Sequence, residues 1–283
     1  MSITSYDKQQ VSGYWNNRPC GSWLAGEAAP GSPEFFDRTE LARYQREPFI
    51  GRFARFDEWR GKSVLEVGCG TGSDLSMFAR HGAHTFGLDL TQTGATLATQ
   101  RLRHHNAAGF AMVADCERVP FADDTFDLVY SWGVIHHSPN TPLAAKEIVR
   151  VTKPGGRIVV MIYNRRSLVA LQAYLMYGLL KGKPMRSTAE IIASHLESPG
   201  TKAYTESEAR AMFSTIEDVS VTPVVTVYDL RIGRERFLPQ WMCSLVPQRL
   251  GYFMVIEGRK PLIASASSKS RVAGVESLSE VSA

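Results

Sequence analysis

The chain has 283 residues, and 44% of them are hydrophobic, which is enough for one substantial core. The net charge is only +4, and no lysine- or arginine-rich run of the kind that binds nucleic acid is present. The four cysteines form neither a CxxC pair nor a cluster with histidines, so we expect reduced thiols and no bound metal. The first residues lack an apolar stretch of signal-peptide length, and we therefore expect a cytoplasmic protein.

The first 60 residues are predicted to form a helical cap ahead of the main domain. Residues 40–46 are charged and helical in character, and Pro48 predicts a break because the residue before a proline leaves the helical region. Residues 49–59 are predicted to form a second helix that packs on a sheet.

Residues 64–74 carry the strongest local pattern in the chain. A short apolar strand that contains Glu66 runs into glycines at positions 68, 70 and 72, and a helix is predicted directly after them. Such a turn suits a nucleoside-containing cofactor at the carboxyl end of a parallel strand. The spacing differs from the dinucleotide pattern G-x-G-x-x-G because residue 73 is Ser, and the charge of Glu66 suits an ammonium group better than a pyrophosphate. This acidic-x-G-x-G-x-G pattern resembles the first motif of the class I S-adenosylmethionine-dependent methyltransferases.

The next hundred residues strengthen the resemblance. Strands are predicted at about 82–89, 110–115, 126–131 and 157–163, and the phrase Pro120-Phe-Ala-Asp-Asp-Thr-Phe-Asp-Leu-Val is typical of the same family. The family implies a Rossmann-like three-layer α/β sandwich with a seven-stranded, mostly parallel sheet. The main domain is then expected over residues 61–262, with a helical insert at about 165–215. The Ser- and Ala-rich residues 263–283 are expected to be disordered.

The resemblance also implies the cofactor, S-adenosylmethionine, and its product, S-adenosylhomocysteine. Asp89 ends the second strand 17 residues beyond Gly72, where a carboxylate would hold the ribose hydroxyls; the alternative is a helix cap. Asp115 or the N–H of Cys116 would meet the adenine, unless Asp115 caps a turn. Arg43 would pair with the carboxylate of the methionine end or remain a solvated helix charge. The expected cofactor residues are Glu66, Gly68, Gly70, Gly72, Asp89, Leu90, Asp115, Cys116, Ser131, Trp132 and Arg43.

Two adjacent histidines, His136 and His137, follow the fourth strand. A histidine can take a proton from a hydroxyl or amine near neutral pH, so one of the pair is a candidate general base, with His137 favoured. The alternative is that an imidazole only positions the loop. His195, in a polar loop between two predicted helices, is a further candidate base.

Residues 168–180 are apolar on all sides and flanked by cations, but 13 residues are too few to span a bilayer. We expect a buried helix or a lid over the substrate, with membrane contact as the less favoured alternative. Aromatic residues of the cap and the insert are candidates for the substrate wall, or else ordinary packing residues: Tyr14, Trp15, Tyr44, Tyr163 and Tyr204.

The sequence therefore predicts an enzyme that transfers a methyl group to a small acceptor by in-line displacement, without a metal, and leaves open whether that acceptor is hydrophobic. Oxygen is the first choice of acceptor atom, followed by nitrogen or carbon. Nucleic acid is not an expected partner. Two alternatives remain open: a cofactor-binding protein that catalyses a non-methyl reaction such as cyclisation, and a membrane-associated scaffold.

Overall fold

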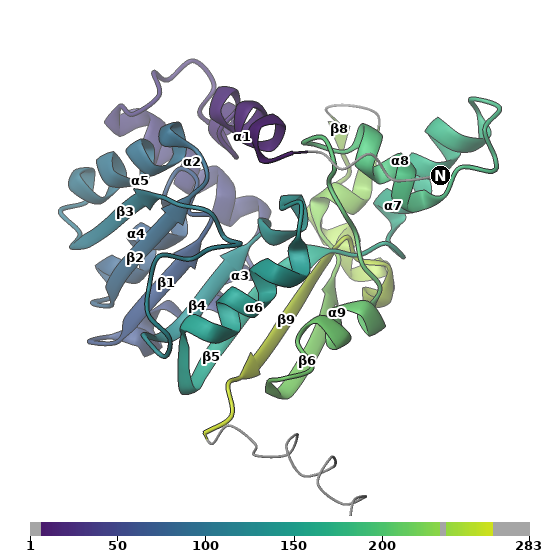
Figure 1. Ribbon diagram of the computed structural model, residues 1–283. Helices are drawn as coiled ribbons and strands as arrows, with labels where there is room; N and C mark the ends of the chain where they lie inside the picture. Colours follow the sequence, from purple (N-terminus) through teal and green to yellow (C-terminus); the bar gives the residue numbers. More distant parts are fainter. Residues whose placement is uncertain (1–6, 233–235, 263–283) are drawn as a thin grey trace, which may run out of the picture.

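The computed structural model describes residues 7–232 and 236–262, so the tail predicted to be disordered lies outside the described residues. Seven strands form one sheet in the order β3-β2-β1-β4-β5-β9-β6 (Figure 1). β9 is antiparallel to both neighbours, and the other pairs are parallel. The strands are β1 Ser63–Val67, β2 His84–Asp89, β3 Gly109–Val113, β4 Phe126–Trp132, β5 Thr152–Tyr163, β6 Glu217–Val224 and β9 Phe253–Arg259. The predicted seven-stranded, mostly parallel sheet is confirmed.

The sheet is buried on both faces, which explains why its central strands are apolar throughout. Side chains alternate along β4, so Leu128 and Tyr130 belong to one hydrophobic core and Val129 belongs to the other. The first core contains residues of α3, α4 and α7, and the second contains residues of α6 and α9. The result is a helix–sheet–helix sandwich (Figure 1).

The α-helices are α1 Lys8–Asn17, α2 Pro33–Arg46, α3 Ile50–Ala54, α4 Ser73–Arg80, α5 Gln92–His104, α6 Thr141–Val151, α7 Leu168–Tyr174, α8 Thr188–His195 and α9 Glu206–Met212. Short 3₁₀ turns are η1 Ser22–Ala25, η2 Phe56–Trp59, η3 Ile135–His137, η5 Val227–Leu230, η6 Gln240–Leu245 and η7 Gln248–Leu250. η4 (Leu175–Leu179) is a π-helical turn, and β7 (Arg231–Ile232) pairs with β8 (Arg236–Phe237).

The N-terminal segment is helical, as predicted, but its second helix is not continuous. The helix expected over 49–59 is divided into α3 and η2 by Arg55, whose φ of 49° is left-handed and cannot continue a right-handed helix. The apolar pattern in this stretch indicated the packing face correctly but did not reveal the break.

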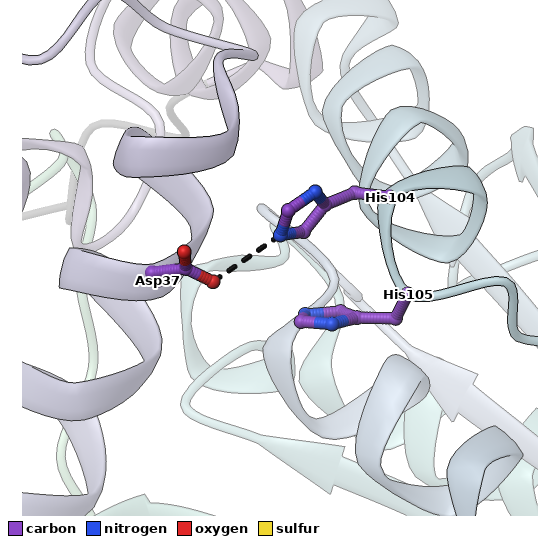
Figure 2. Close-up of side chains that lie close together, drawn as sticks. All are labelled: Asp37, His104 and His105. Carbon is purple, nitrogen blue, oxygen red and sulfur yellow. Dashed lines mark hydrogen bonds and ion pairs between the residues drawn. The ribbon is translucent and has the colours of Figure 1, made fainter.

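α2 of the cap is fastened to α5 by buried polar contacts. Arg101 is fully buried and donates to the carbonyls of Thr71 and Phe36 and to the hydroxyl of Thr39. At the end of α5, His104 and His105 face α2, and the Nε2 atom of His104 lies 3.2 Å from a carboxylate oxygen of Asp37 (Figure 2). These contacts hold α2 against the domain beside the glycine turn.

The insert is not a fully buried helix, so that form of the prediction is wrong, and the lid over the substrate stays a prediction. Val169, Ala170 and Ala173 of α7 face inward and are buried, but the opposite face is exposed. An apolar residue on every side gives no signal of which face packs, because helical periodicity is then absent. In the described part of the chain, no helix is both long and apolar enough to cross a membrane.

Candidate active site

A cavity of about 330 Å³ lies where the five parallel strands end. Its wall combines the segments that follow β1, β2, β3 and β4, the end of β5, the N-terminal cap and the insert. This is the edge at which open α/β sheets bind ligands. Figure 1 shows α1 above the same edge of the sheet.

The glycine turn after β1 requires glycine at more than one position. Gly68 has a φ of 78°, and a Cβ there would come within 2.3 Å of the Val134 side chain. Gly72 has a φ of 79° just before α4, and a Cβ there would come within 2.7 Å of the Ala98 backbone. The turn is therefore packed too closely for any side chain at these two positions.

Glu66 is the strongest sign that the cavity accepts a cation. Its side chain is buried in the wall, and Oε2 has no hydrogen-bond partner among the described residues. Burial, followed by the nearby charge of Asp74, raises the pKa of Glu66 well above its usual value. An uncompensated buried carboxyl is costly, and an ammonium group would supply the missing partner. The buried carboxylate of Glu66 therefore fits the ammonium group at the amino-acid end of S-adenosylmethionine.

Asp74 and Arg43 form a buried pair beside Glu66. Asp74 lies in the first turn of α4 and accepts from Arg43 Nε at 3.0 Å and Arg43 Nη2 at 2.5 Å. The hydroxyls of Tyr44 and Tyr130 donate to the same carboxylate at 2.9 and 3.0 Å. Burial alone would lower the pKa of Arg43, but the charge of Asp74 raises it well above its ordinary value. Arg43 lines the cavity, and its guanidinium is paired to Asp74, a residue that we did not single out; its contact with the cofactor carboxylate stays a prediction.

Asp89 lines the cavity at the end of β2 and also supports its own loop. Oδ1 accepts from the N–H and the hydroxyl of Thr91, and Oδ2 accepts from the N–H of Gly70 at 2.9 Å. Three of about four acceptor sites of the carboxylate are thus used by the protein. Thr91, and not Asp89, is the N-cap of α5. The ribose role remains a prediction, and the structure leaves one acceptor site on Asp89 for it.

α1 packs at the edge of the cavity against the segment that follows β3. Lys8 pairs with Asp115 at 2.5 Å and with Glu117 at 2.6 Å, and the side chain of Asn16 accepts from the N–H and hydroxyl of Thr93. Asp115 also accepts from the N–H of Glu117, as a turn cap would. Asp115 is therefore engaged on both oxygens, and Cys116 also lines the cavity, so the adenine role of this segment stays a prediction.

His137 lies in the wall and is oriented by the loop after α8. Thr201 donates its hydroxyl hydrogen to the Ser198 carbonyl at 2.6 Å, so at 3.0 Å from His137 Nδ1 it can only accept. Ser198 Oγ lies 2.9 Å from the same Nδ1 and can donate or accept, so the two hydroxyls orient the imidazole without fixing its tautomer. Nε2 is buried, has no hydrogen-bond partner among the described residues and lies 3.3 Å from a carboxylate oxygen of Glu197. The same oxygen accepts from the hydroxyl of Tyr163 at 2.7 Å.

His136 points away from the cavity wall. It is fully buried, packs 3.9 Å from the Tyr163 ring, and its burial and the neighbouring His137 lower its pKa well below the usual value. The structure therefore separates the two histidines: His137 has access to the cavity, and His136 does not. A ring nitrogen of each and a carboxylate oxygen of Glu197 lie within 4.8 Å of one another, a spacing that a cation could bridge. The expectation of metal-independent chemistry thus stays a prediction.

His195 also lies in the wall, at the end of α8. Its Nδ1 is 3.1 Å from the carbonyl of Ile191, and its ring stacks on Tyr177 with 4.2 Å between centroids. His195 is thus the last residue of a helix and has fewer polar partners than His137.

The structure brings most of the predicted residues together. In the wall are Glu66, Gly68, Gly70, Asp89, Leu90, Asp115, Cys116, Trp132, Arg43, His137, His195, Trp15 and Tyr163. Outside it are Gly72, Ser131, His136, Tyr14, Tyr44 and Tyr204.

The residues outside the wall have structural partners. Ser131 donates to the Val67 carbonyl, Tyr44 donates to Asp74, and Tyr204 pairs with Asn164 in an isolated β-bridge. Sequence reasoning did not select several wall residues that the fold supplies: Cys20, Glu47, Asp74 and Glu197. Only Asp74, directly after the glycine turn, carried a local signal.

Comparisons with known proteins agree with this geometry. Residues 65–160 match the family described as "Methyltransferase domain". The chain is 31% identical over 143 residues to a demethylmenaquinone methyltransferase of Thermobifida fusca. The alignment covers 50% of this chain and 59% of the relative. The chain is 38% identical over 128 residues to the chloroplastic tocopherol O-methyltransferase of Arabidopsis thaliana, covering 43% of this chain and 36% of the relative. The alignments thus span about a third to three fifths of these two curated relatives.

A solved structure extends the likeness to the whole fold. The geranyl diphosphate C-methyltransferase from Streptomyces coelicolor, solved with S-adenosylhomocysteine, superposes with a TM-score of 0.58. The superposition covers 89% of this chain and 97% of that one at 16% identity, so it supports the fold alone. The matched domain, the strand order and the glycine turn beside a buried acid agree: residues 65–160 form a methyltransferase domain, and the chain has the fold of the class I S-adenosylmethionine-dependent methyltransferases.

Proposed function

We propose that this protein transfers the methyl group of S-adenosylmethionine to a small-molecule acceptor, with oxygen as the first choice of atom and nitrogen or carbon next. The observation that carries the proposal is the shared cavity. One wall contains the glycine turn with the unpartnered Oε2 of Glu66, and the other contains His137, whose buried Nε2 makes no hydrogen bond to a described residue. A donor and an acceptor bound in one enclosed space can be aligned for displacement.

The cofactor end of the cavity supplies complementary charges. Glu66 would hold the ammonium group and Arg43 the carboxylate of the methionine end, because Nη1 of Arg43 makes no hydrogen bond to a described residue. Asp89 and Cys116 would position the ribose and the adenine. When bound, S-adenosylmethionine supplies an activated methyl group, so the protein mainly aligns the acceptor and excludes water.

The acceptor end would provide a base. With the hydrogen on Nδ1, His137 can take a proton at Nε2, and the adjacent Glu197 carboxylate would stabilise the resulting imidazolium. Removal of this proton makes a hydroxyl a competent nucleophile.

Apolar side chains line the same end and favour an acceptor with a sizeable apolar part: Trp132, Met161, Tyr163, Val169, Tyr252 and Phe253. Two relatives are named for tocopherol and demethylmenaquinone, which supports a small molecule as the acceptor.

The first test is calorimetric titration with S-adenosylmethionine and with S-adenosylhomocysteine, followed by an acceptor panel in which S-adenosylhomocysteine release is measured. Micromolar binding of both and acceptor-dependent release would support methyl transfer. Acceptor consumption without S-adenosylhomocysteine release would indicate a non-methyl reaction such as cyclisation. If neither compound binds, the scaffold alternative becomes the better explanation.

We expect Glu66→Gln to weaken S-adenosylmethionine binding by about ten- to a hundredfold, because a buried hydrogen bond to a charged partner is lost. In the free protein, burial raises the pKa of Glu66, so part of the population is protonated, and an ammonium ligand would favour ionisation. Binding to the unchanged protein should therefore release protons, and binding to the variant should not. Titrations in two buffers of different ionisation enthalpy measure this release; equal release by both proteins would exclude Glu66 as the ammonium partner.

A further inference from the structure

The insert presents an exposed apolar face. Exposed fractions are 52% for Leu171, 44% for Leu175 and 51% for Leu179, which are spaced four residues apart and share one side of the helix. Met176 and Leu180 extend this face, and Leu180 is 81% exposed. We call these five residues the α7–η4 face. Contiguous exposed apolar patches are unusual on monomers and mark interaction sites.

The charge within the segment that carries the α7–η4 face is of one sign. Residues 165–189 contain five basic residues and no acidic one. Arg165 pairs with Glu208 and Arg186 donates to Ser194, but Lys181 and Lys183 are exposed and form no ion pair with a described residue. Apolar side chains next to exposed lysines complement a surface that has an apolar interior and anionic groups outside, which is the make-up of an anionic phospholipid bilayer.

A second apolar segment lies at the same end of the molecule. η5 packs against both α7 and η6, and on η6 the side chains of Trp241 and Leu245 are 67% and 68% exposed. Tryptophan is favoured at membrane interfaces because one end of its ring system is apolar and the other can hydrogen-bond. Figure 1 shows α7 and α8 projecting from the body of the molecule.

The elements that carry these side chains also form the cavity wall. Val169 of α7, Leu196 after α8 and Tyr228 of η5 all line the cavity. We propose that the α7–η4 face, flanked by Lys181 and Lys183, docks the protein peripherally on an anionic phospholipid surface. The cavity would then lie beside the lipid phase, and an apolar acceptor could enter without crossing water. α7 and η4 together are too short to span a bilayer, so the contact is interfacial.

Vesicle flotation of the full chain tests the proposal. The protein should float with phosphatidylcholine vesicles that contain about one third phosphatidylserine, much less with phosphatidylcholine alone, and less as salt is raised. Leu180→Glu should reduce binding at least tenfold, and Lys181→Glu combined with Lys183→Glu should reduce it about tenfold. These positions are exposed, so folding should be unaffected.

Matched controls are available on other surfaces. Leu41→Glu changes another exposed leucine, on α2, and Lys146→Glu reverses an exposed lysine on α6; both variants should float like the unchanged protein. The proposal is overturned if the unchanged protein does not float with anionic vesicles, or if Leu41→Glu is as harmful as Leu180→Glu. A dimer that dissociates on Leu180→Glu, without flotation, would also overturn it and assign the face to a second copy of the chain. Because flotation needs neither cofactor nor acceptor, its failure would leave the proposed methyl transfer untouched.

Discussion

Replacement of Asp74 by alanine is expected to lower the free energy of unfolding by about 3–5 kcal/mol, the usual cost of breaking a buried ion pair. Its side chain is fully buried and accepts four hydrogen bonds, two from Arg43 and one each from Tyr44 and Tyr130. The variant leaves the guanidinium of Arg43, whose side chain is 22% exposed, without its partner, and two hydroxyls without an acceptor. The negative charge also lies in the first turn of α4, where the helix dipole favours it.

Equilibrium unfolding in urea, with and without S-adenosylhomocysteine, measures this effect. The exposed pair Arg55–Glu58, with 3.7 Å between charged atoms, provides the matched control. Glu58→Ala should change stability by no more than about 1 kcal/mol, as for other surface ion pairs. Arg43→Met in the Asp74→Ala background should recover part of the loss, because the unpaired charge is then removed. A loss as small as that of the control would mean that Asp74 does not organise this end of the cavity.

The cofactor end could be predicted because its information is local in sequence. A strand, a glycine turn and a helix within a dozen residues place Glu66 and Gly68 in the wall, and each later strand adds the residue at its own carboxyl end. The parallel sheet then brings these ends together without any further specification by the intervening sequence.

The acceptor end could not be predicted in the same way, because its contacts join distant segments. Ser198 is 61 residues from His137, and Trp15 of α1 packs edge-on against the His137 ring with 5.1 Å between the ring centroids. No periodicity links such pairs; they depend on how the α8–α9 loop and α1 fold back over the sheet. Glu197 illustrates the difficulty, since its φ of 52° is rare for a glutamate and nothing in the sequence marks it.

The same reasoning explains the insert. Its composition predicted a helix correctly, but the choice between burial and exposure depends on the size of the neighbouring surface. Here Val169, Ala170 and Ala173 occupy the available space against the core, and the larger Leu175 and Leu179 remain outside.

His137→Gln is expected to reduce the turnover number by about a hundredfold or more while leaving S-adenosylmethionine affinity within about twofold, because general-base catalysis contributes about 10²–10⁴ to a rate. Glutamine keeps a polar group near Ser198 and Thr201 but cannot take the proton at the position of Nε2. Initial rates of S-adenosylhomocysteine release and calorimetric titration separate the two effects.

His195→Gln is the matched control, since His195 lines the same cavity but is held by the Ile191 carbonyl and stacks on Tyr177. Its turnover should fall far less than that of His137→Gln. The turnover number of Glu197→Gln should lie between those of the two histidine variants, because the Glu197 carboxylate acts only by stabilising the imidazolium that forms on His137. If instead His137→Gln keeps most of its activity and His195→Gln loses it, the base is His195. If both variants stay active, the acceptor reaches the cavity already ionised or reacts without losing a proton, and the apolar wall alone would then position it.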